Sequence, residues 1–162
     1  MGYYEVAQVC LDGHMITNRY NRNLELRKRF CDKCGAETIH QCRSCNTPIQ
    51  GKYIVEGAVV LGSGPGSPPS YCHNCGKSYP WTERRLETAR YLIEEADELN
   101  EEKEELVSSL PDLVNDTPRT ASAAARLRKA LSKVGEHTAL ALKEIFIEIA
   151  SETAKKLLFP GI

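Results

Sequence analysis

The hydrophobic pattern of residues 82–162 predicts helices. Leucine recurs every seven residues in the first part of this segment, with small or apolar residues between. The repeat consists of Leu92, Leu99 and Leu106, interleaved with Ala89, Ala96, Lys103 and Leu110. Such an a/d pattern predicts one long helix that begins near Thr82 and ends at Pro111.

Two further helices are predicted after Pro118. The first covers about residues 121–134, and Gly135 is a natural stop. The second covers about residues 136–158, and its segment Ile145–Ile149 is apolar on more than one side. Such a helix must be covered by neighbouring helices or by a partner. We therefore predict that residues 82–162 form a two- or three-helix module for interaction or oligomerisation.

The first half has the pattern of short strands separated by turns. Residues 3–9 predict a strand that leads to Cys10, and a return strand begins at Met15. Residues 53–55 and 58–61 are further short apolar runs, and a Gly/Pro/Ser tract at 62–70 predicts a loop. The predicted fold class is therefore α+β, with a small β-rich domain at 1–81 and a helical domain at 82–162.

All seven cysteines lie in the first half. Six form three C-x-x-C pairs, and the seventh lies four residues before a histidine. Seven thiols and one imidazole are enough ligands for two tetrahedral sites, which predicts two structural zinc ions in a double zinc ribbon. The predicted ligands are Cys10, His14, Cys31, Cys34, Cys42, Cys45, Cys72 and Cys75.

The spacing leaves two ligand pairings open. A sequential pairing joins Cys10 and His14 to the first C-x-x-C pair, and the second C-x-x-C pair to the third. An interleaved pairing joins the first C-x-x-C pair to the second, and Cys10 and His14 to the third. We favour the sequential pairing because each hairpin then closes locally. His14 is the least secure ligand, and His40 and His73 are its substitutes.

The residue after each C-x-x-C pair is expected to adopt a left-handed conformation. Two thiolates at this spacing bind one ion only if the backbone curls around it, so that amides donate hydrogen bonds to the sulfurs. Gly35 and Gly76 adopt that conformation at low cost, and Asn46 tolerates it. We therefore predict the same turn three times.

No catalytic role is predicted. Thioredoxin-like redox chemistry needs a C-x-x-C pair at a strand-to-helix junction of a βαβ unit, which this pattern lacks. A catalytic zinc needs an open coordination position, and complete four-ligand sets leave none. Rubredoxin-like iron in the second site is the alternative metal. His137 has no cysteine near it in the helical half, so we predict that the protein is not an enzyme.

The two halves differ in charge. Residues 1–82 carry nine Lys/Arg and six Asp/Glu, a formal +3, whereas residues 83–162 carry twelve and sixteen, a formal −4. Deprotonated thiols around two zinc ions would bring the first half close to neutral, which weakens an interpretation as a nucleic-acid module. The basic segment Arg19–Arg29 and the acidic run Glu94–Glu105 are both interpreted first as solvated surfaces.

No targeting or membrane segment is predicted. Met1–Val9 has no basic region followed by a long apolar run, and the apolar stretch Ala139–Ala150 is interrupted by three charges. We therefore expect a cytoplasmic protein, in which thiols stay reduced and paired cysteines favour metal.

The motif order of the first half resembles that of an uncharacterised bacterial family of unknown function. The segments that carry the resemblance are Val9–His14, Phe30–Gly35, Cys42–Gly51, Pro69–Gly76 and Pro80–Glu83. Members of that family resemble double zinc ribbons, so the resemblance implies structural zinc and a bacterial cytosol. Two later segments, Leu110–Thr120 and Ile149–Lys156, resemble a helical module appended to some members. The resemblance implies no catalytic residue.

Together these patterns predict a non-catalytic adaptor. Residues 1–81 would be a rigid platform whose folding depends on zinc, because so small a β-rich unit buries little apolar surface. Residues 82–162 would bind a protein partner or self-associate. The alternative is a nucleic-acid-binding zinc ribbon that contacts phosphates through Arg19–Arg29.

Overall fold

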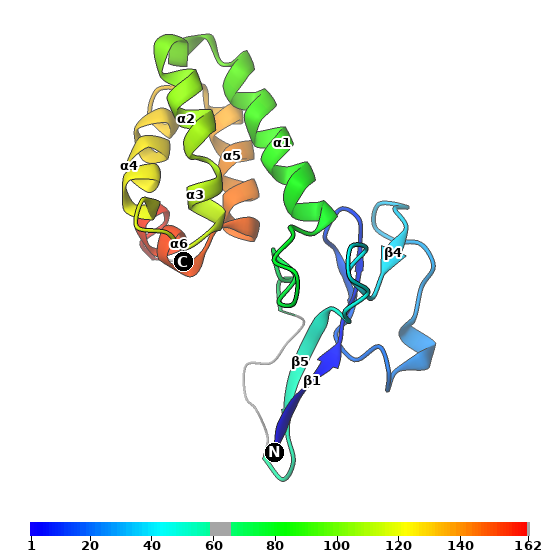
Figure 1. The fold of residues 1–162 in the computed structure, drawn as a ribbon. Helices are drawn as coiled ribbons and strands as arrows, with labels where there is room; N and C mark the ends of the chain where they lie inside the picture. Colours follow the sequence, from blue (N-terminus) through cyan, green and yellow to red (C-terminus); the bar gives the residue numbers. More distant parts are fainter. Residues whose placement is uncertain (59–65, 162) are drawn as a thin grey trace. The chain divides into compact units, whose positions relative to one another are not determined.

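The computed structural model describes residues 1–58 and 66–161 (Figure 1). The chain divides into two compact units, Met1–Glu83 and Arg84–Ile162. The first is built of short strands and turns and the second of helices, which confirms the predicted α+β class. Most of the predicted apolar run at 58–61, and residues 62–65 of the predicted loop, lie outside the described residues.

In the described part of the first unit, five short strands form two small antiparallel sheets. They are β1 (Gly2–Val6), β2 (Gln8–Cys10), β3 (Met15–Thr17), β4 (Thr38–Ile39) and β5 (Gln50–Val55). β1 pairs with β5, and the second sheet has the order β3-β2-β4. The single strand predicted at residues 3–9 is thus divided at Ala7, whose amide donates to the carbonyl of Ile49 at 2.8 Å. The division sends β1 and β2 into different sheets.

The hydrophobic core of the first unit is small. Its buried cluster consists of Ala7, Val9, Cys42, Ile49, Cys72, Tyr79 and Trp81. Two of these side chains are cysteines, so much of the buried surface lies beside thiols rather than between aliphatic groups. A core of this size gives a marginal fold without a further cross-link such as a metal ion.

The second unit is helical, with more segments than the two or three predicted. They are α1 (Pro80–Glu95), which begins at the end of the first unit, the 3₁₀ helix η2 (Asp97–Glu102), α2 (Lys103–Ser109), α3 (Pro111–Val114), α4 (Thr120–Leu131), α5 (Glu136–Ile149) and α6 (Glu152–Leu158). Figure 1 shows α4 and α5 beside the α2–α3 pair, and α6 packs against α4.

Two predicted helices are broken by residues that leave the helical conformation. The expected long helix ends at Ala96, whose ψ is 98°, and Asn100 then takes a φ of 34°. The last helix is broken at Ala150, which is extended, and Ser151 accepts a hydrogen bond from the amide of Ala154 and begins α6. Leu99 and Leu106 of the apolar repeat are buried and Leu92 is partly buried, but the repeat does not form one continuous helix.

The apolar segment of α5 is covered by its neighbours on one side. Leu142, Phe146 and Ile149 are buried, whereas Ile145 and Ile147 are partly exposed. None of the described helices has the length and hydrophobicity that crossing a membrane requires.

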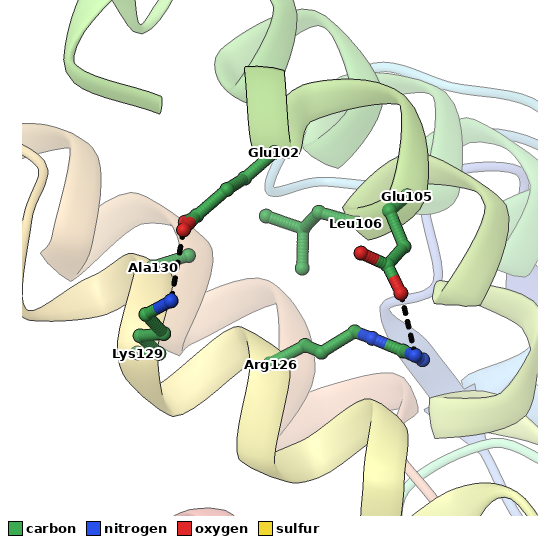
Figure 2. Close-up of a pocket in the computed structure, with 6 residues that line it drawn as sticks. All are labelled: Glu102, Glu105, Leu106, Arg126, Lys129 and Ala130. Carbon is green, nitrogen blue, oxygen red and sulfur yellow. Dashed lines mark hydrogen bonds and ion pairs between the residues drawn. The ribbon is translucent and has the colours of Figure 1, made fainter. Parts of the chain in front are cut away.

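Ion pairs connect the acidic run to α4. Glu102 accepts from Lys129 at 2.9 Å, and Glu105 pairs with Arg126 at 2.6 Å (Figure 2). Glu102 also accepts from Lys133 at 2.8 Å. Individual surface pairs contribute little, but several that share one carboxylate contribute more. Part of the run predicted as a solvated face therefore also fixes η2 and α2 against α4.

Candidate metal centres

The three C-x-x-C pairs lie in three hairpins of the same length and hydrogen-bond pattern. In each, the amide of the first cysteine donates to the carbonyl five residues later, at 2.8–2.9 Å. The amide after the second cysteine donates back to the carbonyl of the first, also at 2.8–2.9 Å. Each hairpin is closed by one bridge, and these bridges are Phe30–Glu37, Gln41–Pro48 and Tyr71–Ser78.

The left-handed residue predicted in each hairpin is confirmed. Gly35 has a φ of 74°, Asn46 of 59° and Gly76 of 71°. This conformation turns the chain back on itself, so that both cysteines of a pair face the same point.

The turn between β2 and β3 supplies the remaining two ligands. The amide of Cys10 donates to the carbonyl of His14 at 3.0 Å, and the amide of Gly13 donates to the carbonyl of Cys10 at 2.9 Å. Gly13 has a φ of 90°. The amide of His14 donates to the Cys10 sulfur at 3.2 Å, a contact that stabilises a thiolate.

The structure brings the eight predicted ligands together in two groups of four. Cys10, His14, Cys31 and Cys34 form the first site, and Cys42, Cys45, Cys72 and Cys75 form the second. Within each site the ligand atoms lie within 4.8 Å of one another. This is the sequential pairing. The two substitute histidines lie elsewhere: His40 stacks on Tyr20, and His73 lines a hollow beside Tyr4 and Pro48.

The separations fit a tetrahedral ion. In the first site, His14 Nδ1 lies 3.5 Å from the Cys10 sulfur, and the Cys10 and Cys34 sulfurs are 3.7 Å apart. In the second, the Cys45 and Cys72 sulfurs are 3.6 Å apart. Sulfurs at about 2.3 Å from a tetrahedral zinc are about 3.8 Å from each other. A disulfide would need roughly 2 Å, and the cysteines are free thiols.

In the second site, the pKa of one cysteine is lowered and the pKa of another is raised. Hydrogen bonds from the hydroxyl and the amide of Thr47 lower the pKa of Cys45 to about 5. The Lys77 amide also favours the Cys75 thiolate, but desolvation and the neighbouring thiols outweigh it and raise the pKa of Cys75 to about 11.

In the first site too, the pKa of one cysteine is lowered and that of another is raised. Partial burial opposes ionisation of Cys31, yet the amides of Lys33 and Cys34 prevail and lower its pKa. The amide of Ala36 favours the Cys34 thiolate, but desolvation and the nearby Cys31 and Cys10 thiols raise its pKa to about 12. Crowded thiols resist simultaneous ionisation until a cation neutralises them, so both sites are suited to a divalent metal ion.

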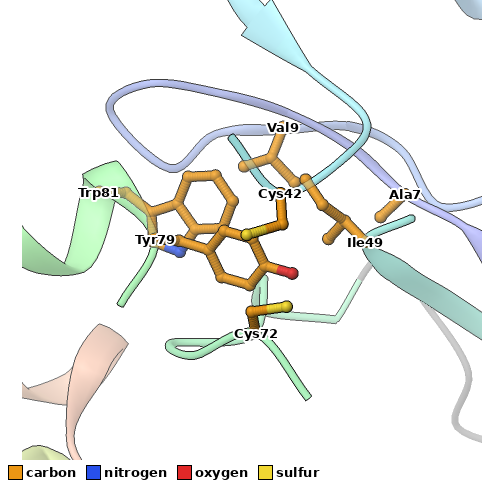
Figure 3. Close-up of a cluster of buried hydrophobic side chains, with 7 residues drawn as sticks. All are labelled: Ala7, Val9, Cys42, Ile49, Cys72, Tyr79 and Trp81. Atoms are coloured by element: carbon orange, nitrogen blue, oxygen red, sulfur yellow. The ribbon is translucent and has the colours of Figure 1, made fainter. Parts of the chain in front are cut away.

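Two aromatic side chains outside the predicted ligand set enclose the second site. Tyr79 and Trp81 are almost fully buried and stack with ring centroids 4.7 Å apart. The Trp81 indole donates to the carbonyl of Pro69 at 2.9 Å. Figure 3 shows the Tyr79 hydroxyl beside the sulfur of Cys72. Desolvation by burial and the negative charge of a Cys72 thiolate raise the pKa of Tyr79.

Among the described residues the Tyr79 hydroxyl has no conventional hydrogen-bond partner. A buried hydroxyl is rarely left unpaired, and a thiolate sulfur is the acceptor within reach. Tyr79 lies just outside its hairpin in sequence, so ligand spacing alone gave no signal for it.

Comparison with known proteins identifies a family. A family model described as an uncharacterized protein conserved in bacteria (DUF2321) matches residues 3–158. No curated protein and no solved structure matches the chain. The family match covers nearly the whole chain, including all eight candidate ligands and the helices. The chain therefore belongs to this bacterial family, DUF2321.

Proposed function

We propose that the first unit is a double zinc ribbon whose two zinc ions are structural, and that the protein is a non-catalytic adaptor. The observation that carries this proposal is the completeness of both sites. Each presents four ligand atoms from the chain itself, so a bound ion needs no water or substrate to complete a tetrahedral shell. Sulfur-rich ligands favour zinc over magnesium or calcium.

Zinc would also supply the folding energy that the small core lacks. Structural zinc sites release about 10–16 kcal/mol on binding in zinc-finger peptides, which is comparable to the whole stability of an ordinary domain. Because Cys42 and Cys72 belong to the buried cluster itself, metal and core would form together.

The second unit is proposed to bind a protein partner or a second copy of the chain. Exposed Tyr91, Leu140 and Leu157 on three of its helices support this role. Light scattering and chemical cross-linking of the full chain test self-association directly. A monomer at all concentrations, combined with wild-type behaviour of a Tyr91→Ala variant in binding to cell extract proteins, would contradict the adaptor role.

Metal analysis tests the zinc proposal. The purified protein should hold about two zinc ions per chain, and Cys42→Ser should hold about one. Ser44→Ala, in the same turn and without a ligand atom, is the matched control and should keep two.

A chelator should unfold the first unit and leave the second folded. Trp81 is the only tryptophan and is buried beside the second site, so its emission should shift to the red. Circular dichroism should retain most of its helical signal. One zinc or none in the wild type would refute the two-site proposal, and loss of most helix on chelation would refute independent units.

A further inference from the structure

The loop between β3 and β4 presents a concentrated positive charge that neither metal site uses. Residues 19–33 hold six Lys/Arg and two acidic residues, a net charge of +4. The loop includes the short 3₁₀ helix η1 (Leu24–Leu26), none of whose residues is buried. Residues 27–30 are also exposed.

Four of the six cations of this loop fall into two groups. Arg22 pairs with Glu5 at 2.6 Å, and Lys28 pairs with Asp32 at 2.7 Å. Arg27 and Arg29, by contrast, form no ion pair with a carboxylate in the described part of the chain. Their guanidinium groups lie over aromatic rings instead.

Those rings create a stacked surface. The Arg27 guanidinium lies 3.9 Å from the centre of the Tyr20 ring, and Tyr20 stacks on His40 at 4.3 Å with the two planes 8° apart. Arg29 lies 5.4 Å from the centre of the Phe30 ring, which is 55% exposed. We call Tyr20, Arg27, Arg29, Phe30 and His40 the stacking surface.

A hollow of about 280 Å³ lies beside this surface. It is lined by Gln8, Tyr20, Arg27, Lys28, Arg29, Glu37, Thr38 and His40. The one carboxylate among them, Glu37, pairs with Arg43 at 3.2 Å. The Gln8 amide is already committed, since it donates to the carbonyl of Lys28 and to the Thr38 hydroxyl. Hydrogen bonds therefore fix one wall of the hollow, and aromatic rings and cationic side chains lie at its edge.

We propose that the stacking surface binds single-stranded nucleic acid, with the guanidinium groups on phosphates and an unpaired base stacked on the exposed Phe30 ring. Preorganised arginines contact phosphate in a fixed geometry, and every base has a face that can stack on an aromatic ring. A duplex hides its base faces, and an acidic peptide would use the charge but not the rings. A lipid surface fits less well, because the exposed Leu24 and Leu26 flank the acidic Glu25.

Fluorescence anisotropy of the zinc-loaded full chain with a short labelled oligothymidylate tests this proposal. If Arg27 and Arg29 each contact one phosphate, log affinity should fall against log salt with a slope of about −1.4. Affinity should then fall roughly 7-fold between 50 and 200 mM salt. No binding at low salt would overturn the proposal. Stronger binding to duplex DNA, polyglutamate or phosphatidylserine vesicles would also overturn it.

Two variants separate charge from stacking. Arg29→Ala should reduce the magnitude of the salt slope by about 0.7, the value for one phosphate contact. Phe30→Leu keeps an apolar side chain but removes the ring, and should weaken binding roughly 5- to 150-fold with the slope unchanged.

Arg128→Ala is the matched control, since it removes the same charge from an exposed position on α4. It should change neither the affinity for the oligonucleotide nor the salt slope. The zinc content of every variant shows whether the ribbon is intact, so failure of the metal proposal and failure of this one give different results. Wild-type binding by both Arg29→Ala and Phe30→Leu would refute the stacking surface.

Discussion

The left-handed residue of each hairpin offers a sharp test of how the backbone assembles the metal sites. Gly76 has a φ of 71°, and a Cβ built there would meet no atom within 4 Å. Gly76→Ala therefore introduces no clash. It destabilises the hairpin only because alanine must then adopt a left-handed backbone conformation. Holding an L-residue in the left-handed region costs about 1–2 kcal/mol. If metal binding and hairpin formation are coupled, zinc affinity at the second site should fall roughly 5- to 30-fold.

The corresponding asparagine in the second hairpin provides the comparison. Asn46 occupies the equivalent position with a φ of 59°, and asparagine tolerates this region better than alanine. Gly76→Asn should therefore retain most of the affinity that Gly76→Ala loses. Gly66→Ala is the control, because a Cβ there also meets nothing and no positive φ is required.

Competition with a chromophoric chelator measures the loss. Stepwise titration should show one weakened site in Gly76→Ala and one normal site, since the first site does not use that hairpin. Gly35→Ala, with a φ of 74° and equally open space, should weaken the other site. Two results would show that the left-handed conformation does not limit assembly. One is that Gly76→Asn binds zinc as weakly as Gly76→Ala. The other is that Gly66→Ala binds zinc as weakly as these two variants.

Three further substitutions test individual contacts. Trp81→Phe removes the indole hydrogen bond to Pro69 and leaves a cavity in the core, and should lower the free energy of unfolding of the zinc-loaded first unit by more than about 1 kcal/mol in denaturant titrations. Ser151→Ala removes the α6 N-cap and should lower the free energy of unfolding by about 1 kcal/mol in urea unfolding followed by circular dichroism. Ser122→Ala, at an exposed position of α4, should leave it almost unchanged. Hydrogen bonds from Lys133 and Lys129 lower the pKa of Glu102 to about 2, below its unfolded value of about 4.3. The stabilisation is therefore complete above the unfolded pKa and is lost as pH falls toward 2. In Glu102→Gln, the melting temperature of the helical unit should depend less on pH in that window. A pH dependence equal to that of the wild type would contradict the pairing.

Local patterns in the sequence predicted the metal hairpins well. The C-x-x-C spacing and the glycine or asparagine that follows act over a few residues, so Gly35, Asn46 and Gly76 could be assigned to left-handed turns from sequence. The choice between sequential and interleaved pairing could not be made that way. It depends on which hairpins pack together, and all four ligand pairs have compatible spacing.

The helical breaks could not be predicted for a different reason. Ala96 and Asn100 leave the helical conformation although alanine is the best helix former and the heptad repeat continues through both. Packing decides instead: the turn through η2 lets Leu99 and Leu106 be buried against a compact unit, which a straight helix would not allow. Tertiary burial outweighs a propensity difference of under about 1 kcal/mol per residue.

A charge sum over half of the chain does not decide whether a local surface binds phosphate. The formal +3 of residues 1–82, reduced further by metal-bound thiolates, weakened the nucleic-acid interpretation. Coulomb forces between exposed groups are screened within about 10 Å, so a ligand responds to the charges beside it and not to the sum over a domain. Six of the nine cations lie within residues 19–33. Arg27 and Arg29 stack on rings and have no carboxylate partner among residues 1–58 and 66–161, so their charge stays available at the surface. A phosphate contact needs only such local cations, and their salt dependence measures how many take part.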